Sequence, residues 1–441
     1  MKSFFRSLLT TTFLTGASLA AHAQASPPAA ATDTARITLT PSLINPVSLQ
    51  SYEAFRAAVQ PLIRQMAGKK VVAMGEGTHG TAEFYKVRFW LTRILVEEHG
   101  FDQLALENTY GDTYQLNEAL QGTADFKPLM RKSLLSIWQN QEMAQVFTWM
   151  QARNRTHRHK VALTGIDAMF SSADVELLQK GLAATGRPDL QALTAQLRQS
   201  AQYKDSAWYQ LSAPSYKLNR KKLFATAIAG HDAADRLLQA LPNVKLSRQQ
   251  RVVLTNAAAN ARMAFDDFYQ VKVNKRESSR DSIFAEMTRL LVHGAGQRLI
   301  IWAHDAHVAR HGVAPEDKGN GGGTGAFLER MFPGQYFVLA TATAGGTFAA
   351  TTQSFISPAS LMAAYPLPQP KAGSWDASLA HVSSPNFYLF TAQLSQSSQL
   401  RPLRLTGQTI GSENFYADMK LSTAFDAVLF LRQTTAATPL P

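Results

Sequence analysis

The sequence predicts an α/β fold with a parallel-rich central sheet, flanking helices in a three-layer arrangement, and an inserted helical lobe over a cleft. Two observations predict it. Short apolar strands alternate with amphipathic helices from residue 71 to residue 164 and again after residue 298, whereas only helical patterns occur between 173 and 292. Strand, helix and strand in succession imply right-handed parallel crossovers, which place helices on both faces of one sheet.

The first run of elements follows from hydrophobic periodicity and from glycine stops. Helix 81–98 carries apolar residues at helical spacing, and Gly100 ends it. The strands of this run are short apolar segments that lead into glycine or acidic residues. In order, the predicted elements are helix 52–67, strand 71–74, helix 81–98, strand 103–106, helix 139–155 and strand 161–164.

The second run resumes after the helical insertion. Breaks at Gly186-Arg-Pro188 and at residues 212–215 divide the insertion into separate helices. A glycine-rich loop at 319–325 precedes a short helix. The predicted strands of this run are 298–302, 336–340, 387–390 and 427–431, of which the last two close the sheet.

The N-terminus has the pattern of an export signal. Lys2 and Arg6 precede a mostly apolar stretch, and Ala21-His22-Ala23 is a small-x-small cleavage pattern. The apolar stretch is too short for a membrane-spanning helix, so we expect no stable membrane insertion after cleavage. These features predict a periplasmic or secreted protein. The expected organisation is a signal peptide at 1–23, a leader at 24–50, a first core segment at 51–172, the helical insertion at 173–296 and a second core segment at 297–441.

Composition narrows the chemistry. The 441 residues are 45% hydrophobic and 17% charged, as in a folded globular protein. The absence of cysteine excludes thiolate metal sites and cysteine nucleophiles. Loss of the two basic residues of the signal leaves 42 basic against 32 acidic residues, a net charge of +10 spread along the chain. No nucleic-acid-reading motif accompanies this charge, so we expect a small-molecule partner and no nucleic acid.

Polar residues collect where four of the predicted strands end. Glu76 and His79 follow the first strand, Glu107 the second, Asp167 the third, and His304 with His307 the strand at 298–302. In an open parallel sheet these carboxyl ends share one edge, where ligands bind. The six side chains are therefore expected to converge on one site, although they are spread over 232 sequence positions, from 76 to 307.

Two alternative sites fit the same residues. Gly75-x-Gly77-x-x-Gly80 matches a dinucleotide-binding fingerprint, but Glu76 within it would repel phosphates. Alternatively, a divalent metal could be bound by the histidines and glutamates, since such sets suit zinc, iron or manganese. The expected ligands are Glu76, His79, Glu107, His304 and His307.

The remaining catalytic option is water activated by histidine. The chain contains no G-x-S-x-G, which disfavours a serine hydrolase. A histidine beside a carboxylate can deprotonate water near neutral pH, while a second histidine or an arginine stabilises the developing oxyanion. Arg88, nine residues after His79 in a mostly apolar helix, is the candidate for stabilising the oxyanion.

Taken together, these segments resemble the erythromycin esterase family. Trp138, Glu142 and Trp149 are also part of the resemblance. The matching segments, in chain order, are Gly75-Glu-Gly-Thr-His79-Gly, Arg88, Leu106-Glu107-Asn108, Gly165-Ile-Asp167, Arg276-Glu-Ser-Ser-Arg280-Asp281, Trp302-Ala-His304-Asp-Ala-His307 and Phe425-Asp-Ala-Val428.

The resemblance implies a hydrolase that opens a macrolide lactone or another carboxylic ester with activated water and without a cofactor. It assigns the general base to His79, carboxylates that orient the base or the water to Glu76 and Glu107, and charge stabilisation to Arg88, His304 and His307. Asp167, Trp138 and Arg280 are the expected substrate-binding residues. The metal-dependent alternative stays open, as does a binding protein that has kept the site but not the reaction.

Overall fold

The computed structural model describes residues 37, 39–211, 213, 215–275, 279–292, 294, 296–311, 323–394 and 399–440. The predicted signal peptide, the first part of the leader and most of the glycine-rich loop lie outside these residues. Within the described ranges, none of the helices combines the length and the apolar character that a membrane crossing requires.

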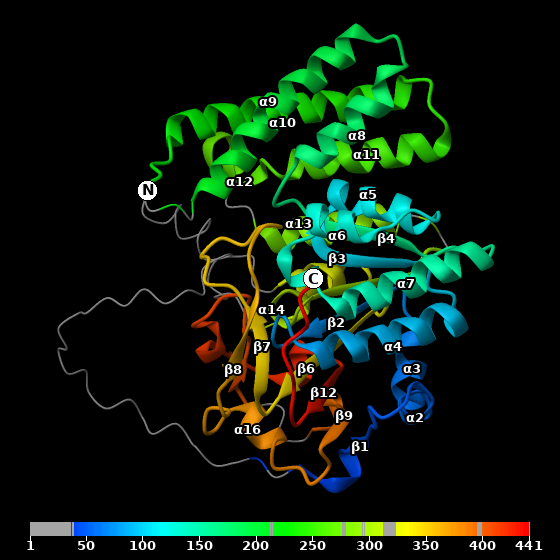
Figure 1. Ribbon diagram of the computed structural model, residues 1–441, viewed down its shortest axis with the longest axis vertical. Helices are drawn as coiled ribbons and strands as arrows, with labels where there is room; N and C mark the ends of the chain where they lie inside the picture. The colour runs from blue at the N-terminus through cyan, green and yellow to red at the C-terminus, as the bar shows by residue number, and fades with distance from the viewer. Residues whose placement is uncertain are drawn as a thin grey trace, which may run out of the picture.

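An eight-stranded sheet forms the centre of the molecule, with strand order β1-β9-β12-β6-β2-β5-β3-β4 (Figure 1). The five strands from β6 to β4 and the β12–β6 pair run parallel, while β9 is antiparallel to both β12 and β1. The strands are β1 (Asn45–Pro46), β2 (Val71–Glu76), β3 (Gln103–Thr109), β4 (Ala162–Asp167), β5 (Leu299–His304), β6 (Tyr336–Thr343), β9 (Asn386–Phe390) and β12 (Ala427–Leu431). The predicted α/β fold class is therefore confirmed.

Two apolar cores lie on opposite faces of this sheet, because alternate residues of a strand point to opposite sides. Val72 and Met74 of β2 pack with the helices of one face, and Val71 and Ala73 belong to the core of the other face. The helices of the first face are α2 (Tyr52–Ala58), α3 (Gln60–Ala67), α4 (Ala82–His99), α6 (Lys127–Ser133) and α7 (Gln141–Thr156).

The other face carries the helical lobe, drawn mainly in green in Figure 1. Asn219 and Ser247 cap two of its helices by accepting backbone N–H groups. The helices of this face are α8 (Ser172–Ala183), α9 (Pro188–Gln210), α10 (Arg220–Ala240), α11 (Arg248–Met263), α12 (Asp266–Tyr269), α13 (Arg280–Leu291), α14 (Asp305–Val308) and α15 (Thr324–Met331). The predicted segment boundaries at 173 and 296 stay a prediction, although α8 to α13 span nearly that range.

Several elements differ from the sequence prediction. The predicted helix 52–67 is two helices, because Val59 leaves helical geometry and Pro61 starts α3. Helix α5 (Tyr110–Leu120), which follows β3 directly, was not predicted. Two small hairpins of the C-terminal part were also not predicted, β7 (Gly346–Ala350) with β8 (Ala363–Leu367) and β10 (Arg401–Arg404) with β11 (Tyr416–Met419). The same holds for three short helices, α6 in the first half of the chain and α16 (Trp375–Leu379) and α17 (Leu421–Ala424) in the second.

Candidate active site

The candidate site lies at the carboxyl edge of the sheet, where β2 and β5 are neighbours. Glu76 and His304 are the last residues of these strands and are paired in register. The chain leaves β2 toward α4 on one face and leaves β5 toward α14 on the other. This divergence is the geometry that opens ligand sites in doubly wound sheets.

Glu76, His79 and Arg88 are linked by side-chain hydrogen bonds, and we call them the buried triad. His79 Nδ1 lies 2.7 Å from Glu76 Oε1, and the Arg88 guanidinium donates to Glu76 Oε2 at 2.6 Å. Arg88 and Glu76 are fully buried, and His79 is 3% exposed. Glu76 therefore accepts the Nδ1–H, and in that tautomer Nε2 is the nitrogen that can accept a proton. Among the described residues, none forms a hydrogen bond with that Nε2.

His304 lies against His79, with ring centroids 4.7 Å apart, but its own nitrogens are both occupied. Its Nδ1 accepts from the Ala306 N–H at 3.1 Å, and its Nε2 donates to the Thr406 carbonyl at 3.1 Å. Burial and the neighbouring His79 lower the pKa of His304 well below the usual value. The ring is thus a neutral, fixed wall of the site.

Glu107, Asp167, Arg280, Asp281 and His307 form a second group, which we call the outer network. Arg280 begins α13 and donates to Glu107 Oε1 at 3.0 Å and to Asp167 Oδ2 at 2.5 Å. Its side chain is 17% exposed, whereas those of Glu107 and Asp167 are 5% and 1% exposed. Burial alone would raise the pKa of Glu107, but His307, Arg280 and His79 together hold it well below the usual range.

His307 is the second histidine of the outer network. Its Nδ1 lies 2.8 Å from Asp281 Oδ1, and its Nε2 lies 3.5 Å from Glu107 Oε1. Burial lowers the pKa of His307, but Asp281 and Glu107 outweigh that effect, so the pKa is raised. Two carboxylates therefore favour the cationic form of a ring that is 13% exposed.

The glycines of the Gly75-x-Gly77-x-x-Gly80 motif serve close packing. A Cβ on Gly75 would lie 1.8 Å from Asp305 Oδ1, and one on Gly77 would lie 2.4 Å from the Thr341 carbonyl oxygen. Gly80 has φ +69° and lies against the Ala349 carbonyl. The Gly77 and His79 amides already donate to Thr341 Oγ1 and to the Thr406 carbonyl. This geometry argues against a dinucleotide site, because such a loop must offer free amides to phosphates.

A bulge in β3 places Glu107. The register between β3 and β4 shifts between Leu106 and Thr109, so Glu107 lies within the strand and not after it. Gly165 on β4 makes this approach possible, because a Cβ there would lie 2.2 Å from the Asn108 carbonyl oxygen. Trp138 fixes the same segment by donating its indole N–H to the Glu107 carbonyl at 3.1 Å.

Trp138 has no exposed surface, and its ring neighbours are Tyr85 and the Arg88 guanidinium. The structure therefore places it behind the site, as a support for Glu107 and the buried triad. Its role in substrate binding stays a prediction. The other predicted site residues come together at the sheet edge, linked by the contacts described above.

Three contributors were not singled out from the sequence. Asp281 accepts from His307 and from Thr324, the Thr406 carbonyl accepts from both His79 and His304, and buried Asp305 packs beneath Gly75. Asp281 had a signal, since it directly follows Arg280 at a helix start. A main-chain carbonyl such as that of Thr406 has none, because it does not depend on residue type.

The structure gives the metal alternative no ligand group. Over the described ranges, no set of three or more histidine, aspartate or glutamate side chains is placed to bind a metal ion. The physical reason is visible at Glu76 and His304. Both carboxylate oxygens of Glu76 and both ring nitrogens of His304 already have protein partners.

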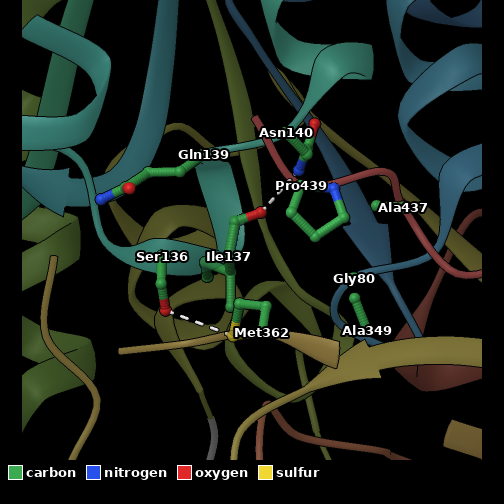
Figure 2. Close-up of a pocket in the computed structure, with 9 residues that line it drawn as sticks. All are labelled: Gly80, Ser136, Ile137, Gln139, Asn140, Ala349, Met362, Ala437 and Pro439. Carbon is green, nitrogen blue, oxygen red and sulfur yellow. Dashed lines mark hydrogen bonds between the residues drawn. The ribbon is translucent and has the colours of Figure 1, made fainter. Parts of the chain in front are cut away.

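A small pocket of about 200 Å³, counting its opening to solvent, lies beside Gly80 (Figure 2). Ile137, Ala349 and Met362 give it an apolar lining. The Ser136 hydroxyl donates to Met362 Sδ at 3.3 Å, and Asn140 donates to the Ile137 carbonyl. Polar groups at its wall are thus satisfied internally, and the pocket is separate from the charged groups of the site.

Fold and site together define an α/β protein with a histidine–carboxylate centre at the carboxyl edge of its sheet. The erythromycin esterase family model matches residues 96–434, so the chain belongs to the erythromycin esterase family. The matched range contains the whole outer network and begins after the buried triad.

Curated relatives align over shorter stretches. Erythromycin esterase type II of Escherichia coli is 27% identical over 117 residues, which is 26% of this chain and 27% of that protein. Erythromycin esterase type I of Escherichia coli is 35% identical over 103 residues, 23% and 24% of the two chains. A putative hydrolase of Bacillus subtilis is 29% identical over 122 residues, 27% and 26% of the two chains. The alignments therefore span about a quarter of each relative.

Solved structures match over most of the chain. A succinoglycan biosynthesis protein superposes with a TM-score of 0.72 at 21% identity, covering 90% of this chain and 96% of that one. A histidine-to-asparagine variant of erythromycin esterase EreC in its open conformation gives 0.61 at 18% identity, covering 88% and 95%. At these identities the likeness shows a shared fold.

Proposed function

We propose that this chain is a hydrolase that cleaves a carboxylic ester or macrolide lactone with water activated by His79. The observation that carries the proposal is the buried triad, in which Arg88 holds Glu76 and Glu76 orients His79. Family membership and the names of the Escherichia coli relatives support an ester substrate.

His79 is the proposed general base. With its Nδ1–H bound to Glu76, its Nε2 takes a proton from water as the water oxygen attacks the ester carbonyl carbon. The carbonyl C=O electron pair moves to oxygen and gives a tetrahedral oxyanion. When the oxyanion collapses, the bond between the carbonyl carbon and the alkoxy oxygen breaks. The alkoxy oxygen takes the proton back from His79 Nε2, which leaves a carboxylic acid and an alcohol. Glu76 stabilises the imidazolium that forms in between.

The outer network is proposed to supply positive charge to the reacting ester. Arg280 and the cationic form of His307 lie together, with Arg280 Nη1 3.4 Å from His307 Nε2. Charge placed where the oxyanion develops is usually the largest electrostatic contribution to such a reaction. Neutral His304 has no free nitrogen for proton transfer and is proposed to fix the ring plane of His79.

The proposed location is the periplasm or the extracellular space, on the pattern of residues 1–23. Intact mass of the chain produced in its own cell type tests this proposal. A mature N-terminus at Gln24 supports export, and an uncleaved chain in the cytoplasm contradicts it.

The function is tested by incubating the purified chain with a panel of macrolides and simple esters and measuring product mass. We expect a product heavier than its lactone by one water, or an acid and an alcohol from a simple ester. The same assay is repeated after exhaustive chelation, where we expect the rate to be unchanged. Absence of any hydrolysis over the panel contradicts the proposal, and loss of the rate on chelation favours the metal-dependent alternative.

A further inference from the structure

Four aromatic side chains from three separate segments meet at one end of the helical lobe. Phe170 and Tyr209 are stacked, with ring centroids 5.1 Å apart and planes at 10°. Trp208 makes edge contacts with Phe170 at 6.3 Å and with Phe355 at 5.2 Å. We call these four residues the aromatic cluster. They come from the β4–α8 connection, the last turn of α9 and the β7–β8 connection.

The aromatic cluster has one buried side and one open side. Phe170 is 5% exposed, but Tyr209, stacked on it, is 50% exposed. Trp208 anchors the β7–β8 connection by donating its indole N–H to the Ile356 carbonyl at 3.3 Å. A large aromatic ring left half in solvent on a rigid aromatic base is a surface suited to an apolar ligand.

The first segment of the aromatic cluster is continuous with the outer network. Phe170 is three residues beyond Asp167, which is at most about 10 Å of chain. The Met169 amide donates to Asp167 Oδ1, and the same carboxylate binds Arg280. The position of Phe170 is therefore coupled to the charged groups of the site.

Helix α9 holds this segment from the other side. Asp205 is 5% exposed and accepts the Ser171 and Ser172 amides at 3.1 and 2.9 Å. Tyr209 lies one helical turn further along, so it shares a helix face with Asp205. The stack of Tyr209 on Phe170 is thus fixed by hydrogen bonds on both of its segments.

The third segment, the β7–β8 connection, begins beside the buried triad. The Ala349 amide at the end of β7 donates to the Gly80 carbonyl at 2.9 Å, next to His79. The chain then runs from β7 to Phe355. The aromatic cluster consequently bridges connections that start at both halves of the site, beside Asp167 and beside His79.

We propose that the aromatic cluster is the binding surface for the bulky apolar part of the ester substrate, with Tyr209 as its exposed contact. The proposal rests on the proposed function and adds the residues that select large esters over small ones. An ester without a large apolar part gains no binding affinity from the aromatic cluster, because such an ester contacts the protein only at its reacting group.

The test uses two esters with the same leaving group, 4-nitrophenyl acetate and 4-nitrophenyl 2-naphthoate. In Tyr209→Ala we expect kcat/KM for the naphthoate to fall about tenfold through KM, since one ring contact is lost, while that for the acetate is unchanged. Tyr209→Phe should restore the naphthoate rate. Leu400→Ala removes a side chain that is 60% exposed elsewhere and should change neither rate.

An equal fall for both esters, or no fall for either, overturns the proposal. If the wild-type chain cleaves neither of these two esters, binding decides the aromatic cluster on its own, and the proposed function still rests on the macrolide and ester panel. In that case 2-naphthamide is titrated and followed by tryptophan fluorescence, with Trp208→Phe as the control for the signal. A Kd about tenfold weaker in Tyr209→Ala supports the aromatic cluster, and an equal Kd overturns it.

Discussion

The buried triad and the outer network face each other across the end of β5, and they differ in burial and in charge balance. In the buried triad one carboxylate lies between one guanidinium and one imidazole, and the carboxylate and the guanidinium are fully buried. In the outer network three carboxylates surround Arg280 and His307, whose side chains are 17% and 13% exposed.

This difference separates two tasks. In the buried triad a carboxylate whose two oxygens both have partners holds one imidazole in one orientation and one tautomer. In the outer network the excess of carboxylates keeps Arg280 and His307 charged, and their partial exposure lets them contact a substrate. The comparison therefore assigns orientation of the base to the buried triad and charge at the reacting group to the outer network.

The largest expected loss of stability is in Arg88→Met. Removal of the guanidinium leaves the fully buried Glu76 carboxylate without its cation, so the free energy of unfolding should fall by about 3–5 kcal/mol. Urea unfolding at pH 7 measures it. Arg56→Met is the matched control, because its 2.6 Å pair with Glu98 is exposed and should leave the midpoint unchanged. Equal midpoints for the two variants would contradict the difference in burial.

Arg280→Met should affect activity more than stability. Its guanidinium is the cation shared by Glu107 and Asp167, so we expect kcat/KM to fall about 100-fold. The loss of unfolding free energy should be smaller than in Arg88→Met, because solvent reaches this group. Steady-state kinetics and urea unfolding are measured on the same sample. Full activity with a large loss of stability would mean that Arg280 is only structural.

The pKa of His307 gives the outer network a dependence on pH. The folded pKa is raised above the usual value of about 6.5, so the cation stabilises the fold fully below that pH. This contribution is lost as the pH rises through the folded pKa. The difference in unfolding free energy between wild type and His307→Gln should therefore shrink from pH 6 upward. A difference that is constant from pH 6 to pH 9 would contradict the raised pKa of His307 in the folded chain.

The smallest expected effect is in Trp138→Phe. The ring volume largely remains, but the hydrogen bond to the Glu107 carbonyl is lost, so the free energy of unfolding should fall by about 1 kcal/mol. Urea unfolding measures this loss, and kcat/KM should change by less than threefold. A loss of substrate affinity without a loss of stability would instead support the predicted contact of Trp138 with substrate.

The two regions also differ in how far the sequence could predict them. The buried triad lies within 13 residues of one strand–helix unit, so hydrophobic periodicity was enough to place Glu76 and His79 after the strand and Arg88 on the next helix. The pairing of Arg88 with Glu76 was not predicted. The outer network joins β3, β4, α13 and α14, and its contacts depend on the strand order and on the β3 bulge. The β3–β5–β2 adjacency, the Thr406 carbonyl and the short C-terminal hairpins have no local signal in the sequence, because they arise from long-range pairing.

The central claim is that His79, oriented by Glu76, activates the water. It is tested most directly by kcat/KM of His79→Ala on an ester that the wild-type chain cleaves, together with its thermal unfolding. We expect kcat/KM to fall about 10²–10⁴-fold, with partial recovery on addition of imidazole and an unfolding midpoint close to that of the wild type. Hydrolysis within threefold of the wild-type rate would contradict it.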